Sequence, residues 1–415
     1  MKYKPVSKRE TYKFFYFGKS KGSLKDVFDM NVTGDQALVK KINKSLILHT
    51  IRRHPELSRA RISEITGLNK ATVSNLVAEL QQEQLVLEAG PGESSGGRKP
   101  LILHFNAMAG CVIGMELRVK QISAVLCDLN GNVLAETEAP LHRHDLAYTF
   151  EQMKTMIAGL IAGVPSTHYG IVGIGVGVPG MVDENGVVLF APNLGWETVD
   201  LRSMLEEHFA LPVIIDNEAN SGALGELHFG RGQDVRHLLY ISAGSGIGSG
   251  IIISGELYKG SRGYAGETGH MSIEAEGMPC SCGSRGCWEL YASEKAYDLA
   301  ASELPSYQTR ELVRYAAEGD EAARGQFHVM GNYLGIGLTN LINGFNPELI
   351  VLGGALSEAR EWLEEPMQRV VAKRTLPYHK QQLEIAFSAL GSRATMIGAG
   401  FSAAMHFLGH TRVMV

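Results

Sequence analysis

One histidine and three cysteines have the spacing of a metal site. His270 is followed, after nine residues, by Cys280, Cys282 and Cys287 within a span of eight residues. Three thiolates and one imidazole complete a tetrahedral Zn2+ site, and glycines between the cysteines let the loop wrap closely around the ion. Four protein ligands leave no position for an activated water, so we expect a structural zinc ion. The alternative is a set of structural cysteines beside an unrelated histidine.

Carboxylates and carboxamides occur beside this loop and in two segments upstream. Glu267 and Glu289 flank the loop, and the upstream segments contribute Asn193, Asn217 and Glu218. If such groups converge in a cleft, they suit a polyhydroxylated ligand, because each hydroxyl can donate to one group and accept from another. Taken singly, each of them would be an ordinary polar surface residue.

Three short helices are predicted in front of these residues. The first begins near Gln36 and ends before Pro55, because proline disfavours helix in the residue ahead of it. Ser58 can cap a second helix, and Asn69 can cap a third that runs from Lys70 to about Gln82. The expected inward residues are Ile42, Leu46, Ile47 and Ile51, then Ile62 and Ile65, then Val73, Leu76, Val77 and Leu80.

A turn and a hairpin complete this module. Gly67 supplies a permissive turn residue between the last two helices, which is typical of a helix-turn-helix. Residues 85–88 and 101–105 have the pattern of two strands joined by a glycine-rich tip. That hairpin would be the wing of a winged helix-turn-helix.

The third helix would present its N-terminal half to DNA. Its apolar stripe faces inward, so its polar residues face outward, where recognition helices meet base edges. The expected contacts are Lys70, Thr72, Ser74 and Asn75. Arg98, beside two glycines in the hairpin tip, suits a phosphate or minor-groove contact. The alternatives are a three-helix module that binds protein and an ordinary linker arginine.

Charge is distributed unevenly along the 415 residues, whose net charge is -5. Residues 1–100 hold 18 Lys and Arg against 10 Asp and Glu, which leaves 21 against 34 in the remainder. A basic first quarter on an acidic body is typical of a DNA-binding module joined to an effector domain, and a solvated basic tail is the other interpretation. No apolar run approaches the roughly 18 residues of a membrane helix, so we expect a cytoplasmic protein without a membrane partner.

The remainder of the chain predicts an α/β fold with two similar lobes. Three strands with an Asn-Gly turn indicate an antiparallel opening, and a weaker echo of the same pattern follows after residue 238. The predicted divisions are 1–36, a basic and flexible extension; 37–105, the winged helix-turn-helix; 106–223, a first lobe on which a C-terminal helix at about 391–408 packs back; and 224–390, a second lobe with the zinc loop.

Several motifs resemble the ROK family of repressors, open reading frames and kinases. They are Gly266-Glu267-Thr268-Gly269-His270, the cysteine loop with Cys287-Trp288-Glu289, and Gly244-Ser245-Gly246-Ile247-Gly248. With the helix-turn-helix in front, residues 37 to 405 are similar to the repressor branch, and 280–296 and 333–347 resemble the xylose repressors of Gram-positive bacteria. The resemblance implies an actin-like ATPase fold, a homodimer or dimer of dimers, and sugar contacts at Asn193, Asn217, Glu218, Glu267, His270 and Glu289.

Two departures from the family's kinases argue against an enzyme. The kinases open with an Asp-x-Gly hairpin that holds ATP phosphate, whereas this chain has Arg118 in place of the glycine, where backbone must approach phosphate. Glu218 stands where the kinases have their catalytic aspartate. Its extra methylene displaces a general base by more than the roughly 1 Å that already costs about a hundredfold in rate.

We therefore expect a homodimeric repressor of sugar catabolic genes that binds double-stranded operator DNA and is released when D-xylose enters the cleft. Xylose is glucose without its C6 hydroxymethyl group, so the longer Glu218 could fill the vacant space. The alternatives are a repressor that responds to glucose or another sugar, a glucokinase-like enzyme with a fused DNA-binding domain, and a repressor released by a partner protein.

Overall fold

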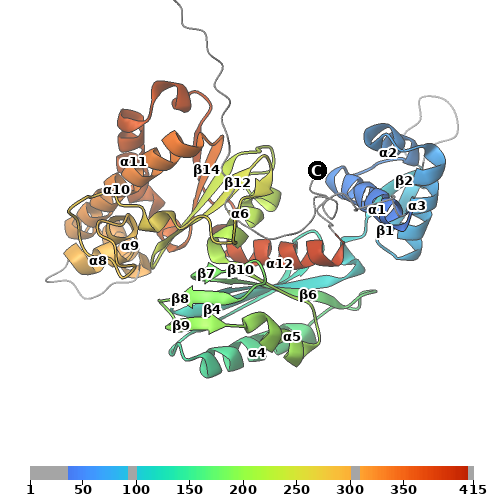
Figure 1. The fold of residues 1–415 in the computed structure, drawn as a ribbon, viewed down its shortest axis with the longest axis horizontal. Helices are drawn as coiled ribbons and strands as arrows, with labels where there is room; N and C mark the ends of the chain where they lie inside the picture. Colours follow the sequence, from blue (N-terminus) through green and yellow to red (C-terminus); the bar gives the residue numbers. More distant parts are fainter. Residues whose placement is uncertain (1–35, 92–100, 301–308, 410–415) are drawn as a thin grey trace, which may run out of the picture.

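The computed structural model describes residues 36–91, 101–300 and 309–409 and has three parts (Figure 1). The smallest is the predicted winged helix-turn-helix. Its elements are α1 (Gln36–Arg53), α2 (Arg59–Thr66), α3 (Lys70–Gln82), β1 (Val86–Pro91) and β2 (Leu101–Phe105). β1 and β2 pair in antiparallel fashion, which confirms the hairpin, while its tip and the predicted extension 1–36, apart from Gln36, lie outside the described residues.

Local chemistry sets the helix ends in this domain as expected. The Ser58 side chain accepts from the backbone N–H of Arg61 at 3.3 Å, and that of Asn69 accepts from Thr72 at 2.8 Å. Gly67 ends α2 with a φ of 71°, a backbone conformation that glycine adopts without strain. The predicted caps and turn residue are therefore confirmed.

Two of the predicted inward residues are wrong. Leu46 and Ile65 are 40% and 43% exposed, whereas Leu48, which was not predicted, is 5% exposed. Leu48 belongs to the hydrophobic cluster that the winged helix-turn-helix shares with α12, and it lines a small gap together with Leu408. Ile65 lies at the edge of the short α2, whose one covered side is already occupied by Ile62.

The first lobe is built on a five-stranded sheet in the order β10-β6-β3-β4-β5. β3, β4 and β5 run antiparallel, as predicted, and β6 and β10 run parallel to β3. One face is covered by α4 and α5 and the other by α12 (Figure 1). The elements are β3 (Cys111–Leu117), β4 (Gln121–Asp128), β5 (Val133–Pro140), α4 (Leu146–Ala162), β6 (Ile171–Val178), α5 (Leu201–Phe209), β10 (Val213–Asn217), α6 (Glu218–Phe229) and α12 (Ala394–Phe407).

The second lobe repeats this topology, with the order β13-β12-β11-β14-β15. Its first three strands are antiparallel, and β14 and β15 run parallel to β11. The similarity between the two lobes that the sequence pattern predicted is therefore a structural repeat. Its elements are β11 (Leu238–Ala243), β12 (Ile247–Ile253), β13 (Glu256–Leu257), α7 (Glu289–Ala292), α8 (Lys295–Ala300), α9 (Thr309–Ala317), α10 (Glu321–Phe345), β14 (Leu349–Gly353), α11 (Arg360–Arg374) and β15 (Glu384–Phe387).

A small sheet and five short 3-10 helices complete the described chain. The sheet of β7 (Met181–Val182), β8 (Val188–Ala191) and β9 (Trp196–Val199), which was not predicted, adds to the first lobe near the cleft. The 3-10 helices are η1 (Ala107–Ala109), η2 (Thr268–His270), η3 (Ala355–Ala359), η4 (Pro377–Lys380) and η5 (Gly391–Arg393). The predicted domain boundaries stay predictions, and the one at residue 223 falls inside α6.

α12 lies very close to the first-lobe sheet. A methyl group at Gly114 of β3 or Gly175 of β6 would overlap the carbonyl oxygens of Met396 and Ala399 on α12. The absence of a side chain at these two glycines therefore allows α12 to pack directly against the strands. Phe401 and Met405, farther along α12, belong to the same hydrophobic cluster as the core of the winged helix-turn-helix.

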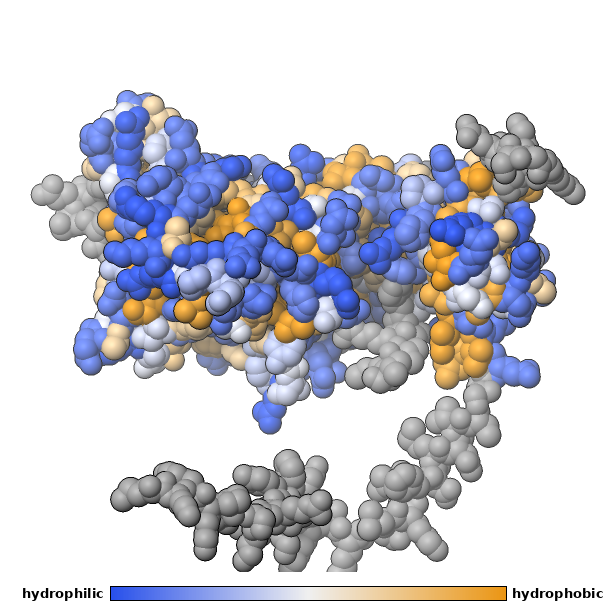
Figure 2. Space-filling model, turned by 90° about the horizontal axis from the view of Figure 1, so that it is seen from above, coloured by the Kyte–Doolittle hydropathy of each residue, from blue (hydrophilic) through white to orange (hydrophobic). Residues whose placement is uncertain are grey.

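The outer surface is mixed in polarity. In the view of Figure 2, polar residues cover much of the visible face of the two lobes, while hydrophobic residues form a more continuous band on the flank of the winged helix-turn-helix. Exposed apolar side chains of this domain include Leu38, Val39 and Leu46 on α1. Among the described residues, no helix is long and apolar enough to cross a bilayer.

Candidate sugar cleft and metal cluster

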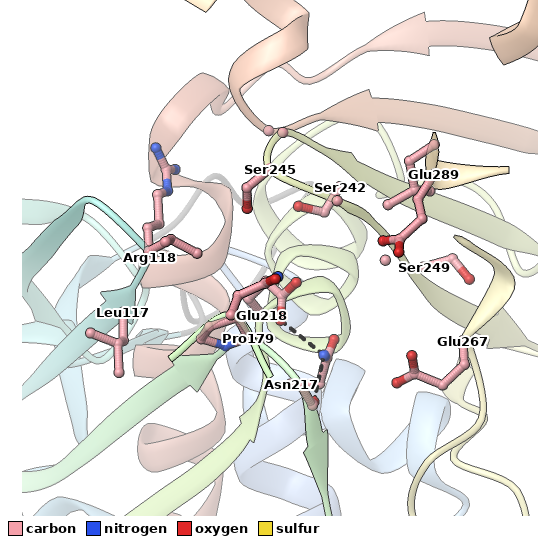
Figure 3. A pocket seen from close by; sticks show the side chains of 18 of the residues that line it. Leu117, Arg118, Pro179, Asn217, Glu218, Ser242, Ser245, Ser249, Glu267 and Glu289 are labelled. Atoms are coloured by element: carbon pink, nitrogen blue, oxygen red, sulfur yellow. Dashed lines mark hydrogen bonds between the residues drawn. The ribbon is translucent and has the colours of Figure 1, made fainter. Parts of the chain in front are cut away.

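A cavity of about 570 Å3 lies where the two lobes meet, a volume within the usual range for small-molecule sites. Figure 3 shows Asn217 and Glu218 between Arg118 at one end of it and Glu267 and Glu289 at the other. All six residues expected to contact a sugar line this cavity: Asn193, Asn217, Glu218, Glu267, His270 and Glu289. The fold thus brings together side chains that are up to 96 positions apart in the sequence (193 to 289).

Asn217 and Glu218 are placed by the start of α6. Asn217 is the N-cap, and its side-chain oxygen accepts from the N–H groups of Ala219 and Asn220. Its side-chain nitrogen donates to Glu218 Oε2 at 2.8 Å and to the carbonyl of Gly180 at 3.0 Å. Both hydrogens of the Asn217 amide are therefore in use, and its direct effect in this arrangement is to orient Glu218.

Glu218 has an unusual proton affinity for a carboxylic acid. Its burial in the cleft raises its pKa from 4.5 to about 8, and the negative charges of Glu267 and Glu116 add to the effect. At neutral pH this carboxyl group is mostly protonated, so it can donate a hydrogen bond as well as accept one. Both capacities suit a ligand covered in hydroxyl groups.

The predicted metal ligands form a compact cluster. One ligand atom from each of His270, Cys280, Cys282 and Cys287 lies within 4.8 Å of all the others. The Sγ atoms of Cys282 and Cys287 are 3.6 Å apart, and Cys280 Sγ is 3.7 Å from His270 Nδ1. A tetrahedron with Zn–S bonds of about 2.3 Å has edges of about 3.8 Å, so the four side chains fit a zinc ion.

Glu289 connects the metal cluster to the cleft. It is 4% exposed, and its Oε1 lies 3.7 Å from His270 Nδ1 and 3.6 Å from Cys280 Sγ. Lys295 at the start of α8 places its Nζ 2.7 Å from the same oxygen. The other oxygen, Oε2, lies 2.8 Å from where a side chain at Gly246 would begin, so the glycine gives the carboxylate room.

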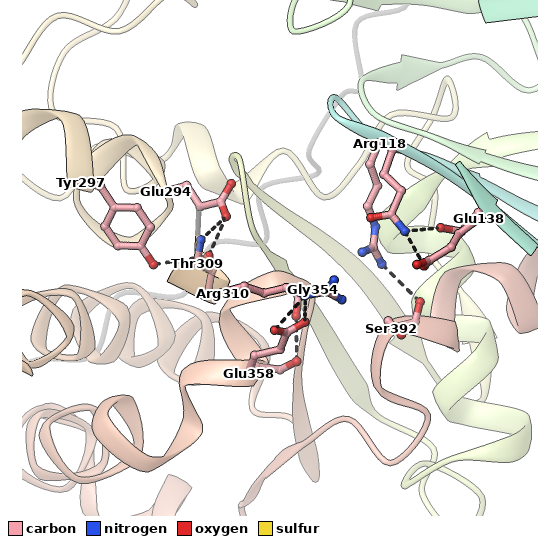
Figure 4. Close-up of polar contacts among 12 residues, drawn as sticks. Arg118, Glu138, Glu294, Tyr297, Thr309, Arg310, Gly354, Glu358 and Ser392 are labelled. Carbon is pink, nitrogen blue, oxygen red and sulfur yellow. Dashed lines mark hydrogen bonds and ion pairs between the residues drawn. The ribbon is translucent and has the colours of Figure 1, made fainter. Parts of the chain in front are cut away.

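The opposite end of the cavity is occupied by ion pairs of the chain itself (Figure 4). Arg118 pairs with the buried Glu116 at 2.6 Å and donates to the Ser392 carbonyl at 3.2 Å. Arg310 likewise pairs with Glu358, whose Oε1 is 3.2 Å from its Nε. Two of the cationic side chains that line this end, Arg118 and Arg310, are therefore already paired with carboxylates.

Two lysines near the cleft were missed by sequence reasoning. Lys295 neutralises Glu289, and Lys259 of the second lobe lies 2.5 Å from Asp216 of the first lobe. The Asp216 carboxylate also accepts from the Asn220 side chain at 3.0 Å, so this ion pair joins the two lobes beside Asn217. Neither lysine stands in a recognisable motif, and only the acidic partners carried a signal in the sequence.

The expected DNA contacts lie on one helix. Lys70, Ser74 and Asn75 are exposed on α3, and Thr72 is half-buried. The inward residues Val73, Leu76, Val77 and Leu80 are all buried as predicted. Arg98 lies outside the described residues.

These features define a two-lobed protein of the sugar-kinase fold, with a metal cluster at its cleft and a winged helix-turn-helix at its N-terminal side. The chain belongs to the ROK family, whose model matches residues 112–405. The MarR family model matches residues 41–93, across the winged helix-turn-helix. The expected fold class is thereby confirmed.

The chain is similar to a repressor, to a transcriptional regulator and to a kinase. The xylose repressor of Bacillus spizizenii is 42% identical over 381 residues, which are 90% of this chain and 98% of the relative. A crystal structure of a ROK family transcriptional regulator, a homolog of the Escherichia coli MLC protein, has a TM-score of 0.76 at 29% identity, covering 89% of this chain and 98% of that one. A ROK family glucokinase from Streptomyces griseus, in complex with glucose and AMPPNP, has a TM-score of 0.65 at 28% identity, covering 70% and 98%.

Proposed function

We propose that this protein is a transcription repressor that leaves its operator when D-xylose binds in the cleft. The observation that carries the proposal is the convergence of six polar side chains on one cavity in a chain that also has a winged helix-turn-helix. Similarity over nearly the full length of a xylose repressor supports the choice of sugar. Such a protein works in the cytoplasm, where its DNA is.

The sugar is held by groups with complementary hydrogen-bonding capacity. Protonated Glu218 donates to one hydroxyl, while Glu267 and Glu289 accept from others, and Asn193 reaches in from the turn between β8 and β9. His270, Cys280, Cys282 and Cys287 would hold a structural Zn2+, and the ring nitrogen of His270 that does not bind the metal would be left for the sugar. Zinc supplies a fixed orientation of this imidazole.

Two copies of the chain bind a pseudo-palindromic operator. Lys70, Thr72, Ser74 and Asn75 contact base edges and backbone in the major groove, and Arg98 contacts phosphate or the minor groove from the wing. The exposed apolar side chains on α1 are available for contact between the copies. Sugar binding favours an arrangement of the lobes that binds DNA poorly, and by linkage operator DNA weakens sugar binding by the same factor.

Calorimetry tests the sugar. D-xylose, D-glucose and N-acetylglucosamine are titrated into the protein with and without a DNA duplex, which is selected from a random pool by the sugar-free protein. We expect D-xylose to bind best and to bind more weakly when the duplex is present. Equal D-xylose affinity in both conditions contradicts release from DNA, and a stronger signal for another sugar assigns that sugar instead.

Glu218 is the residue that we assign to the preference for a pentose. Glu218→Asp shortens the side chain and reopens the space that the C6 hydroxymethyl group of glucose would need. We expect the ratio of D-xylose to D-glucose affinity to fall about tenfold, on the scale of one methylene in a pocket. An unchanged ratio rejects this assignment.

Sugar phosphorylation is the competing function, because the glucokinase of similar fold binds glucose and a nucleotide analogue. The ion pair of Arg118 with Glu116 disfavours it, because Arg118 stands where the family's kinases have the glycine of their phosphate-binding hairpin. A coupled assay with ATP and these three sugars decides between the two functions, and turnover above the background would establish a kinase.

A further inference from the structure

Arg52 connects the winged helix-turn-helix to the first lobe. It lies in the last turn of α1, and its Nε donates to Asn130 Oδ1 at 3.1 Å in the β4–β5 turn. Its Nη1 is 3.1 Å from Met405 Sδ, and its guanidinium carbon lies 5.1 Å from the centre of the Phe401 ring, both on α12. Burial at this contact lowers its pKa to about 10, against the opposing charge of Asp128. Such a desolvated, stacked arginine strongly restricts the position of its helix.

The Phe401 ring is also contacted by α6. The imidazole of His228 stacks on it with ring centres 4.0 Å apart and an angle of 27° between the planes. Phe229 contacts the same ring edge-on at 5.6 Å. Phe401 therefore contacts both the guanidinium of Arg52 on α1 and the last residues of α6.

α6 begins at the sugar cleft. Its N-cap is Asn217 and its first residue is Glu218, so a single helix of 12 residues runs from the cleft to His228 and Phe229. At about 1.5 Å per residue that distance is about 18 Å, which a helix spans without flexible joints.

α6 and α12 are locked together along their length. Thr395 Oγ1 of α12 donates to the backbone carbonyl of Glu218 at 3.1 Å. A methyl group at Gly398 would overlap the carbonyl oxygen of Ser221, and one at Gly225 would overlap that of Ala394. Helices in such backbone contact shift as one body, because neither has side chains at these points that could take up a displacement.

We propose that Arg52 is the positioning residue through which the state of the sugar cleft reaches the DNA-binding domain. A shift at Glu218 moves α6 and α12 together, and the Arg52–Phe401–His228 stack transfers that shift to α1. The shift is transmitted through residues that are in continuous contact from the sugar cleft to the DNA-binding domain. This inference rests on the proposed function, since it names how the sugar and the operator affect one another.

The test uses Arg52→Lys in the full chain, with Arg53→Lys as the matched control. Lysine keeps the positive charge but lacks the Nε–H that bonds Asn130 and the planar group that stacks on Phe401. Arg53 is exposed, belongs to the same helical turn and makes none of these contacts. The selected operator duplex is titrated with and without saturating D-xylose, and the ratio of the two dissociation constants is the coupling factor.

We expect a wild-type coupling factor in the usual range of about 5 to 150, and a factor of about 2 or less in Arg52→Lys. The D-xylose affinity measured without DNA stays within about twofold of wild type, because no residue of the cleft has changed. Arg53→Lys keeps the wild-type coupling factor. A variant that merely loosened the fold would weaken sugar binding as well, which separates positioning from general damage.

Asn130→Ala provides a second variant that leaves α1 and α12 intact, in case Arg52→Lys lowers the melting temperature strongly. Removing this one partner of Arg52 reduces the coupling factor partially. A wild-type factor in both variants overturns the inference and leaves the proposed function standing. A coupling factor of one in the unsubstituted chain overturns the proposed function and the inference with it.

Discussion

Lys295 Nζ lies 2.7 Å from Glu289 Oε1, and that same oxygen lies 3.7 Å from His270 Nδ1. The lysine therefore holds a buried carboxylate in place beside three thiol groups that, as metal ligands, carry negative charge themselves. Without it, Glu289 would face these groups with no cation except the metal to balance its charge.

Replacing this lysine should weaken sugar binding. In Lys295→Met the side chain keeps most of its length and loses its charge, so Glu289 loses the cation that holds it beside His270. We expect the D-xylose affinity measured by calorimetry to fall about tenfold, which corresponds to about 1.4 kcal/mol. Lys154→Met, which removes an ion pair with Glu151 on the distant α4, is the control. Equal loss in both variants would contradict a local role.

Removing one metal ligand should damage the sugar response before DNA binding. Cys282 is exposed, so Cys282→Ser changes the cluster without disturbing the core. We expect the zinc content by mass spectrometry to fall well below one ion per chain, and D-xylose affinity to fall with it, while sugar-free operator binding persists. Ser284→Ala, in the same loop but outside the cluster, keeps both properties. A full sugar response in a zinc-depleted variant would contradict the proposal that the metal orients His270 for sugar binding.

The raised pKa of Glu218 predicts how stability depends on pH. The unfolded carboxyl group ionises near 4.5 and the folded one near 8, so the folded state binds more protons between these values and loses stability as the pH rises through them. Above pH 8 the loss is complete, at most about 5 kcal/mol at about 1.4 kcal/mol per pKa unit.

Glu218→Gln mimics the protonated form and should remove this loss. Thermal unfolding at pH 5, 6.5 and 8 should show a gain in melting temperature over wild type that grows with pH. Glu184→Gln, at an exposed position, serves as the control and should track wild type. A gain that stays constant across the three pH values would show that Glu218 is ionised in the folded protein at pH 5.

Asn75 tests the orientation of the recognition helix. Asn75→Ala removes an exposed amide suited to an adenine edge, so the affinity for the selected duplex should fall by about 1–3 kcal/mol and the preference at one base pair should relax. D-xylose affinity is unaffected. Gln82→Ala, at the far end of α3, should leave anisotropy titrations unchanged. If the two variants lose affinity equally, α3 does not enter the groove by its N-terminal half.

Local features of the fold were predictable because they depend on neighbours in the sequence. The caps Ser58 and Asn69, the turn at Gly67 and the buried stripe of α3 all follow from contacts within a few residues. Leu46 was expected to face inward and Leu48 was not assigned, because the neighbours that cover a side of α1 come from elsewhere in the chain, Leu408 among them. Helical periodicity shows which residues share one side of a helix, but it does not show which other element covers that side.

The candidate site likewise contains residues that the sequence indicated and residues that only tertiary contacts reveal. Its carboxylates, its histidine and its cysteines stand in motifs, so the sequence indicated them before their convergence was seen. Arg118 was noticed for its position, but its contact with Ser392 spans 274 residues and could not be anticipated. Lys295 and Arg52 carried no signal, because a single basic residue on a helix has many other uses and gains its role here from tertiary contacts.

The place of α12 in the chain also has a consequence during synthesis. This helix packs on one face of the first-lobe sheet, chiefly against β3 and β6, yet it follows every other described element in the sequence. In a growing chain, that face of strands β3, β4 and β6 is therefore exposed until α12 has left the ribosome. Until then Arg52 also lacks its contact with Phe401. Nascent chains should therefore need chaperones against aggregation until nearly the whole chain has been synthesised. A translation stop before residue 394 should yield a chain that can form its helix-turn-helix but can neither hold a sugar firmly nor answer to one.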